Sequence, residues 1–141
     1  MILYTCLEVK IPVFPRRTIS KWIKSVAEHY KRRVGEVSFI FCSESKILEI
    51  NKVYLSHDYF TDIITFDYSS KETISGDIFI SPDTIKSNAD KYKVNFMNEL
   101  YRVMIHGILH LCEMRDKTKK EKAIMREIEN KALEILQEYL Q

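Results

Sequence analysis

The segment VMIHGILHLC, residues 103–112, contains no Lys, Arg, Asp or Glu and decides how the rest of the chain can fold. Together with the residues before it, this segment predicts a helix over residues 96–112. The second half of that helix is apolar on every side, and such a helix belongs in the middle of a domain. We therefore expect the other elements to pack around it.

A good helix start precedes this segment at Ser81, Pro82 and Asp83. These residues supply a capping hydroxyl, a proline at the first helical position and an acid in the first turn. They predict a helix that runs to about residue 92.

The last helix is predicted after a capping box formed by Thr118 and Glu121. Leu136 has the helical phase of a core residue on this helix. We expect one apolar stripe along the same helix, at Ile124, Ile128, Ala132, Ile135 and Tyr139.

Before residue 81 the chain mixes strand and helix patterns without strict alternation. Helices are expected over residues 16–31 and after the capping residue Ser43. Four short segments predict strands: residues 2–11, 37–41, 62–66 and 77–81. The third and fourth of these strands are close enough in sequence to form a hairpin, with its loop around residues 69–75. The predicted fold is a single α+β domain over residues 1–141, with a mixed sheet of about four strands and about five helices.

Composition limits the class of protein. Hydrophobic residues make up 45% and charged residues 30% of the chain, which is typical of a globular domain. Three cysteines without a paired spacing, no long apolar segment and no signal-peptide pattern predict a cytoplasmic location and no membrane span. The net charge of +2 does not by itself indicate a nucleic-acid binder. Any RNA would have to be bound by local clusters, such as Lys117, Lys119, Lys120 and Lys122, which also fit a solvated face.

Two histidines interrupt the apolar helix at a spacing of four. His106 and His110 therefore project from one face, where both imidazoles can reach the same ion. A core would ordinarily have Leu or Ile there, because a buried imidazole without a hydrogen-bond partner costs free energy. The pair is consistent with a transition-metal site, and equally with two core histidines that have ordinary partners.

Asp116, six residues after His110, can supply a third ligand if the chain turns back after the helix. Two histidines and one carboxylate leave coordination positions open for water, as in catalytic zinc sites. Water bound there would become a nucleophile near neutral pH, because its pKa falls to about 7. The alternative is that Asp116 is only a solvated loop residue.

Gly107 argues against a metalloprotease, because the general base of such enzymes is a Glu directly after the first histidine. Gly inside a helix costs roughly 1 kcal/mol relative to Ala, so we expect the space beside Gly107 to be needed for the close approach of a metal, a substrate or another backbone. Cys112 points away from the face of His110 and is expected in the core.

The stretch HGILHLCEMRD, from His106 to Asp116, resembles the signature of the YbeY family of bacterial metal-dependent endoribonucleases, which act in ribosomal RNA maturation. Asn51 to Tyr54 with Asp58, the segment TDIITF at residues 61–66, and GDIFI at residues 76–80 resemble further motifs of the family in the same order. The resemblance covers essentially the whole chain. It implies that His106, His110 and Asp116 are metal ligands, with Asp116 where the family usually has a histidine.

The sequence departs from the family pattern at two places. Glu113 and Met114 replace a Gly-Tyr pair, and Leu55 replaces an arginine associated with RNA handling. His57 lies two residues after Leu55 and is a candidate substrate-binding residue that would contact phosphate instead.

The resemblance implies a zinc-dependent endoribonuclease that is specific for single strands, acts in ribosome biogenesis and associates with ribosomal RNA. Metal-bound water would attack the phosphodiester, and no general acid is identified. Nickel or iron fits the same ligands, and a monomer is expected. Asp62 and Asp77 are candidates for supporting or structural roles. Two alternatives stay open: a ribosome-assembly factor whose metal is mainly structural, and a metal hydrolase with a narrow pocket for a small molecule.

Overall fold

In the computed structural model, which describes residues 1–55 and 61–141, the strands form one mixed sheet in the order β1-β2-β4-β3. Strand β2 pairs in parallel with both β1 and β4, while β3 pairs antiparallel with β4. The predicted hairpin is therefore confirmed as β3–β4. The strands are β1 (Ile2–Leu7), β2 (Arg33–Cys42), β3 (Ile63–Asp67) and β4 (Thr73–Ile80).

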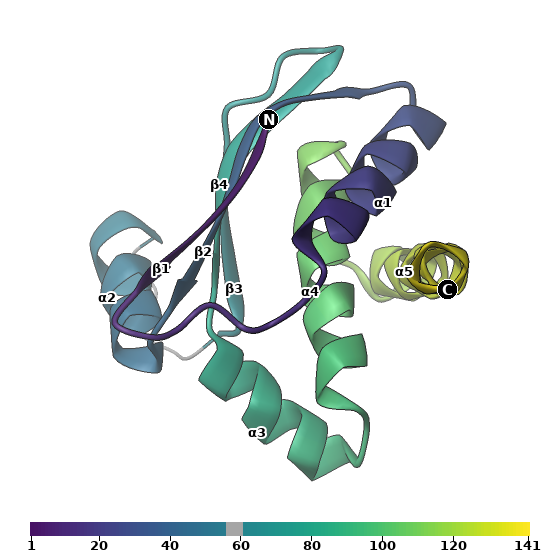
Figure 1. The fold of residues 1–141 in the computed structure, drawn as a ribbon. Coiled ribbons are helices and arrows are strands. Elements are labelled where there is room, and N and C mark those ends of the chain that lie inside the picture. The colour runs from purple at the N-terminus through teal and green to yellow at the C-terminus, as the bar shows by residue number, and fades with distance from the viewer. Residues whose placement is uncertain (56–60) are drawn as a thin grey trace.

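Helices cover both faces of this sheet (Figure 1). Helix α2 lies on one side of the sheet, and α1, α4 and α5 lie on the other, with α4 between the sheet and α5. The helices are α1 (Arg16–His29), α2 (Glu44–Leu55), α3 (Pro82–Tyr92), α4 (Phe96–Leu111) and α5 (Lys119–Leu140). This arrangement confirms the predicted α+β class. None of the helices that the structure describes has the length and apolar character needed to cross a bilayer.

Helix α4 is central because its apolar second half is enclosed as predicted. Between residues 103 and 111 every residue is buried except His106 and His110. Gly107 faces the sheet, where an added Cβ would come within 3.0 Å of Ile78 Cγ2 and 3.1 Å of Ile63 Cδ1. The space beside Gly107 is therefore needed, as expected, but the atoms that approach it belong to strand side chains and not to a backbone.

Local capping fixes where the helices begin. The Oγ of Ser81 accepts a hydrogen bond from the amide of Thr84 at 3.2 Å. Thr118 and Glu121 form the reciprocal capping box that the sequence predicts. The first strand ends at Leu7 instead of residue 11, and Glu8 directly after it has a left-handed φ of 65° that ends the extended conformation.

The buried face of α5 differs from the predicted stripe. Ile124 and Ile135 are 48% and 44% exposed, so the expected stripe is wrong at these positions. Relative to the predicted orientation, α5 is rotated about its own axis. The indole of Trp22 donates a hydrogen bond to the carbonyl of Ala132 at 2.8 Å, and Glu129 occupies the buried face. The predicted stripe was chosen from apolar residues alone, so it could not include Glu129. The buried residues of α5 are Met125, Glu129, Ala132 and Leu136.

Leu136 and Ile135 are adjacent and similar in size, so comparing them tests which face of α5 is buried. Leu136 is fully buried, so Leu136→Ala should lower the free energy of unfolding by about 2–5 kcal/mol through lost burial and a new cavity. Ile135→Ala is the matched control and should cost less than about 1.5 kcal/mol, because much of Ile135 already contacts water. Chemical denaturation of both variants measures the difference. Equal losses would contradict this orientation of α5.

Candidate metal centre

His106 and His110 lie on a face of α4 that the described residues leave partly open to solvent. Their side chains are 21% and 31% exposed, and their Nε2 atoms lie 3.0 Å apart. The two rings meet edge to face, with centroids 4.6 Å apart. The predicted i, i+4 pair therefore converges on one point, as the helical spacing requires.

Asp116 joins this pair because the chain reverses directly after α4. Glu113 adopts a left-handed φ of 69°, and the amide of Met114 bonds back to the carbonyl of Leu109 at 3.1 Å. This is the geometry of a helix C-terminus closed by a left-handed residue. As a result, the carboxylate of Asp116 lies 3.1 Å from His106 Nε2 and 3.4 Å from His110 Nε2.

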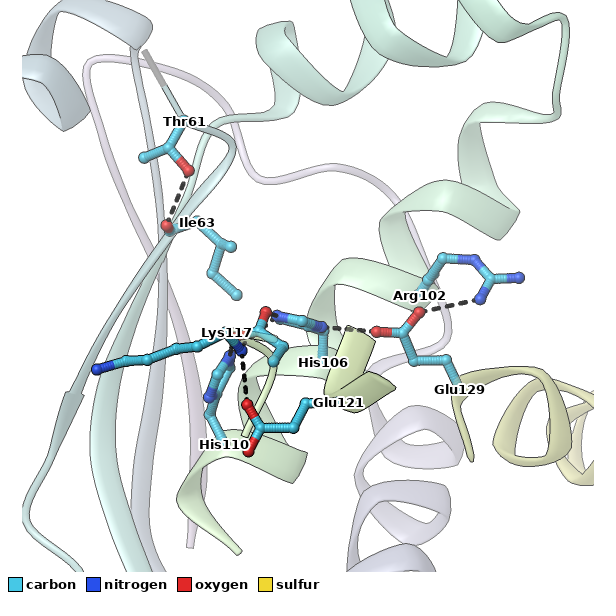
Figure 2. Close-up of polar contacts among 9 residues, drawn as sticks. Thr61, Ile63, Arg102, His106, His110, Lys117, Glu121 and Glu129 are labelled. Carbon is cyan, nitrogen blue, oxygen red and sulfur yellow. Dashed lines mark hydrogen bonds and ion pairs between the residues drawn. The ribbon is translucent and has the colours of Figure 1, made fainter. Parts of the chain in front are cut away.

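The capping box of α5 holds the other side of the Asp116 turn. Glu121 Oε1 accepts a hydrogen bond from the amide of Lys117 at 3.2 Å (Figure 2). It accepts a second hydrogen bond from the amide of Thr118 at 3.0 Å. The backbone directly after Asp116 is therefore fixed to the first turn of α5. Asp116 thus lies on a short connection that is anchored at both ends.

The donor set fits a transition metal. Three donors placed about 2 Å from one ion in a tetrahedral arrangement lie about 3.3 Å from each other. His106 Nε2 lies 3.0 Å from His110 Nε2 and 3.1 Å from Asp116 Oδ2, and His110 Nε2 lies 3.4 Å from the other oxygen, Asp116 Oδ1. One donor atom from each of the three residues lies within 4.8 Å of the other two. Two imidazoles and one carboxylate are also ligands that zinc, nickel and iron accept. His106, His110 and Asp116 could therefore hold a metal ion.

A second carboxylate, on α5, contacts the opposite side of His106. Glu129 Oε2 lies 2.6 Å from His106 Nδ1, and Glu129 Oε1 accepts from Arg102 Nη1 at 3.0 Å. Figure 2 shows Glu129 between Arg102 and His106. Sequence analysis missed both Glu129 and Arg102. The available signal was a charged residue in helical phase with Met125, Ala132 and Leu136 on the buried face of α5.

These surroundings shift the pKa values of the two histidines in opposite directions. Burial alone would lower the pKa of His106, but the hydrogen bond and charge of Glu129, with further help from Asp116 and Asp62, raise it above its ordinary value. Burial and the neighbouring His106 lower the pKa of His110. The pKa of Asp62 is raised, mainly because its carboxyl group is buried. The site therefore concentrates ionisable groups whose pKa values are perturbed, as functional sites commonly do.

A pocket of about 280 Å³ opens beside His106 and Asp116. Its wall carries both signs of charge. The bases are Arg102, Lys122 and Arg126, and the acids are Asp62, Glu99, Asp116 and Glu129. Of the predicted basic cluster, Lys122 lines this pocket.

The remaining predicted residues have different outcomes. His57 and Asp58 lie outside the described residues, so the role of His57 in substrate binding stays a prediction. Cys112 is buried, as expected. Asp62, which was expected to play a supporting part, lines the pocket beside His106.

Comparisons with known proteins agree with the resemblance seen in the sequence. The family model described as Endoribonuclease YbeY matches residues 7–137. A protein named Endoribonuclease YbeY from Parabacteroides distasonis is 51% identical over 97% of this chain and 96% of its own length. One with the same name from Azobacteroides pseudotrichonymphae is 54% identical over 94% of this chain and 96% of its own.

A solved structure agrees as well. The solution structure of a Thermotoga maritima protein is similar with a TM-score of 0.68 and 28% identity, over 96% of this chain and 89% of that one. The fold is therefore shared along nearly the full length of both chains. On this evidence the chain belongs to the YbeY endoribonuclease family.

Proposed function

We propose that this protein is a metal-dependent endoribonuclease that hydrolyses phosphodiester bonds in single-stranded RNA during ribosomal RNA maturation in the cytoplasm. The observation that carries the proposal is the convergence of His106, His110 and Asp116 beside a pocket with basic side chains. Membership of the YbeY family gives this site an RNA substrate instead of a peptide. Gly107 supports the same choice, because it leaves no side chain in the position of a protease base.

Each residue has a definite part in this proposal. His106 and His110 would bind the ion through their Nε2 atoms, and Asp116 would bind it through a carboxylate oxygen. When bound, the ion supplies Lewis-acid polarisation of the phosphodiester and activation of water. Lys122 and Arg126 line the adjoining pocket, where their charges would orient the phosphates of a strand.

Zinc is the ion we propose, since neutral imidazoles and a carboxylate at these separations suit its tetrahedral preference. Nickel and iron use the same ligand types, so metal analysis must include them. One ion per chain is expected, because the three donors surround a single point.

The character of the pocket favours a strand of RNA over a small apolar molecule. Ligand pockets for small molecules are mostly apolar and enclose about 300–1,000 Å³. The pocket beside His106 measures about 280 Å³, and most of its lining residues are charged. Such a charged wall does not suit a buried apolar ligand, whereas the phosphates of a strand could contact the bound ion and the bases Lys122 and Arg126.

Metal content provides the first test. Purified without a histidine tag or chelator, the wild-type protein should contain about one transition-metal ion per chain, and His106→Ala should lose most of it, because ligand loss removes binding energy. His29→Ala is the matched control, since His29 is exposed at the end of α1 and should leave the content unchanged. Elemental analysis after dialysis gives the stoichiometry. A folded wild type that takes up no zinc would refute the proposed ligands.

RNA cleavage provides the second test and separates an enzyme from an assembly factor. His110→Ala should reduce cleavage of single-stranded RNA by about 100-fold or more, because the ion contributes several kcal/mol to the transition state. The variant must keep its circular dichroism spectrum. If His110→Ala folds and cleaves like the wild type, the metal is not used in catalysis. If neither protein cleaves RNA while both bind ribosomes, the assembly-factor alternative is correct.

A further inference from the structure

Glu129 is a buried carboxylate on α5, 5% exposed, that contacts the back of a proposed metal ligand. We propose that Glu129, itself oriented by Arg102, is a positioning residue that fixes the tautomer of His106 so that its Nε2 lone pair faces His110 and Asp116. This inference rests on the proposed metal site. It adds that Glu129 decides which ring nitrogen of His106 keeps a lone pair for the metal.

The hydrogen bonds of Glu129 determine the proton on His106. A carboxylate can only accept, so the 2.6 Å contact from Glu129 Oε2 requires a proton on His106 Nδ1. A neutral imidazole has one proton, and its other nitrogen is then a free lone pair. That nitrogen, Nε2, is the atom that lies 3.0 Å from His110 Nε2 and 3.1 Å from Asp116. Hydrogen bonds of this kind are known to orient histidine ligands and increase their basicity.

Arg102 determines which oxygen of Glu129 is available to the histidine. Its Nη1 donates to Glu129 Oε1 at 3.0 Å, and its Nη2 donates to Asn130 Oδ1 at 2.8 Å. Its Nε lies 3.6 Å from Glu99 Oε1. A guanidinium only donates, so any side chain at position 129 must present an acceptor to Arg102. The charge of Arg102 also compensates a carboxylate that burial would otherwise make costly.

This geometry has an unusual consequence for the isosteric change Glu129→Gln. Glutamine has one oxygen and one NH₂ group in place of two oxygens. Arg102 would take the oxygen, so the NH₂ group would face His106 Nδ1. Two donors cannot hydrogen-bond to each other, and His106 would therefore move its proton from Nδ1 to Nε2. The nitrogen that faces His110 and Asp116 would then be blocked.

The competing explanation is a structural ion pair that only joins α4 to α5. In that case, removing Arg102 from the Glu129→Gln variant would cost further stability and could not restore metal binding. Under the positioning role, Arg102→Met in the same background frees the amide to turn its oxygen toward His106 Nδ1. The double variant should then bind metal better than the single one, a non-additivity that only coupled groups produce.

The experiment compares wild type, Glu129→Gln, Arg102→Met/Glu129→Gln and the matched control Glu99→Gln. Glu99→Gln makes the same chemical change beside the same arginine but without the hydrogen bond to His106. Zinc affinity is measured by competition with a chelator, and thermal melting checks the fold. In the metal-free proteins at alkaline pH, ¹⁵N NMR of the imidazoles reports which nitrogen of His106 carries the proton. This second readout needs neither metal nor activity.

Glu129→Gln should weaken zinc binding by about 10- to 100-fold and move the His106 proton from Nδ1 to Nε2. The double variant should recover most of the affinity and return the proton to Nδ1, while Glu99→Gln should keep the zinc affinity and the Nδ1 proton of the wild type. An unchanged tautomer in Glu129→Gln overturns the inference, and so does a double variant that binds no better than the single one. If the wild type binds no zinc, the proposed function fails, and the NMR comparison alone decides the role of Glu129.

Discussion

The packing of α4 against the sheet is the constraint on which the rest of the structure depends. An apolar helix half can be enclosed only if strands cover one side and other helices cover the remainder. At Gly107 the helix and the strand side chains are so close that a Cβ would contact Ile78 at 3.0 Å. Among the described residues, this packing buries every residue from 103 to 111 except His106 and His110. The fold and the position of the site therefore have one cause.

The chemistry of the site depends on two further elements that meet α4 beside these two histidines. The turn after α4 places Asp116 beside both imidazoles, and the buried face of α5 places Glu129 behind one of them. Each ring nitrogen of His106 therefore has a carboxylate beside it: Glu129 at Nδ1 and Asp116 at Nε2. In a partly buried site with a low local dielectric, such contacts act more strongly than they would in water.

Sequence patterns predicted the features that depend on local chemistry. The helix caps, the β3–β4 hairpin and the enclosure of α4 follow from residue types at fixed spacings, and the structure confirms them. The spacing of His106 and His110 also predicted that these two side chains share one face of the helix, whereas the place of Asp116 beside them was left open by the spacing and was implied only by the family resemblance. The orientation of α5 could not be predicted, because two neighbouring faces of that helix are apolar, and tertiary contacts select the face that contains Glu129. A buried charge becomes favourable only with partners from another helix, which a one-dimensional pattern does not reveal.

The anchoring of Asp116 has a thermodynamic consequence. Because its neighbours Lys117 and Thr118 bond to the first turn of α5, and Glu129 lies further along that helix, both carboxylates leave His106 together if α5 detaches. The histidine pair alone would remain on α4. Local opening of α5 and disassembly of the site are therefore one cooperative event. A ligand whose binding requires His106, His110, Asp116 and Glu129 together therefore raises the free energy needed to detach α5, because it binds only the closed form.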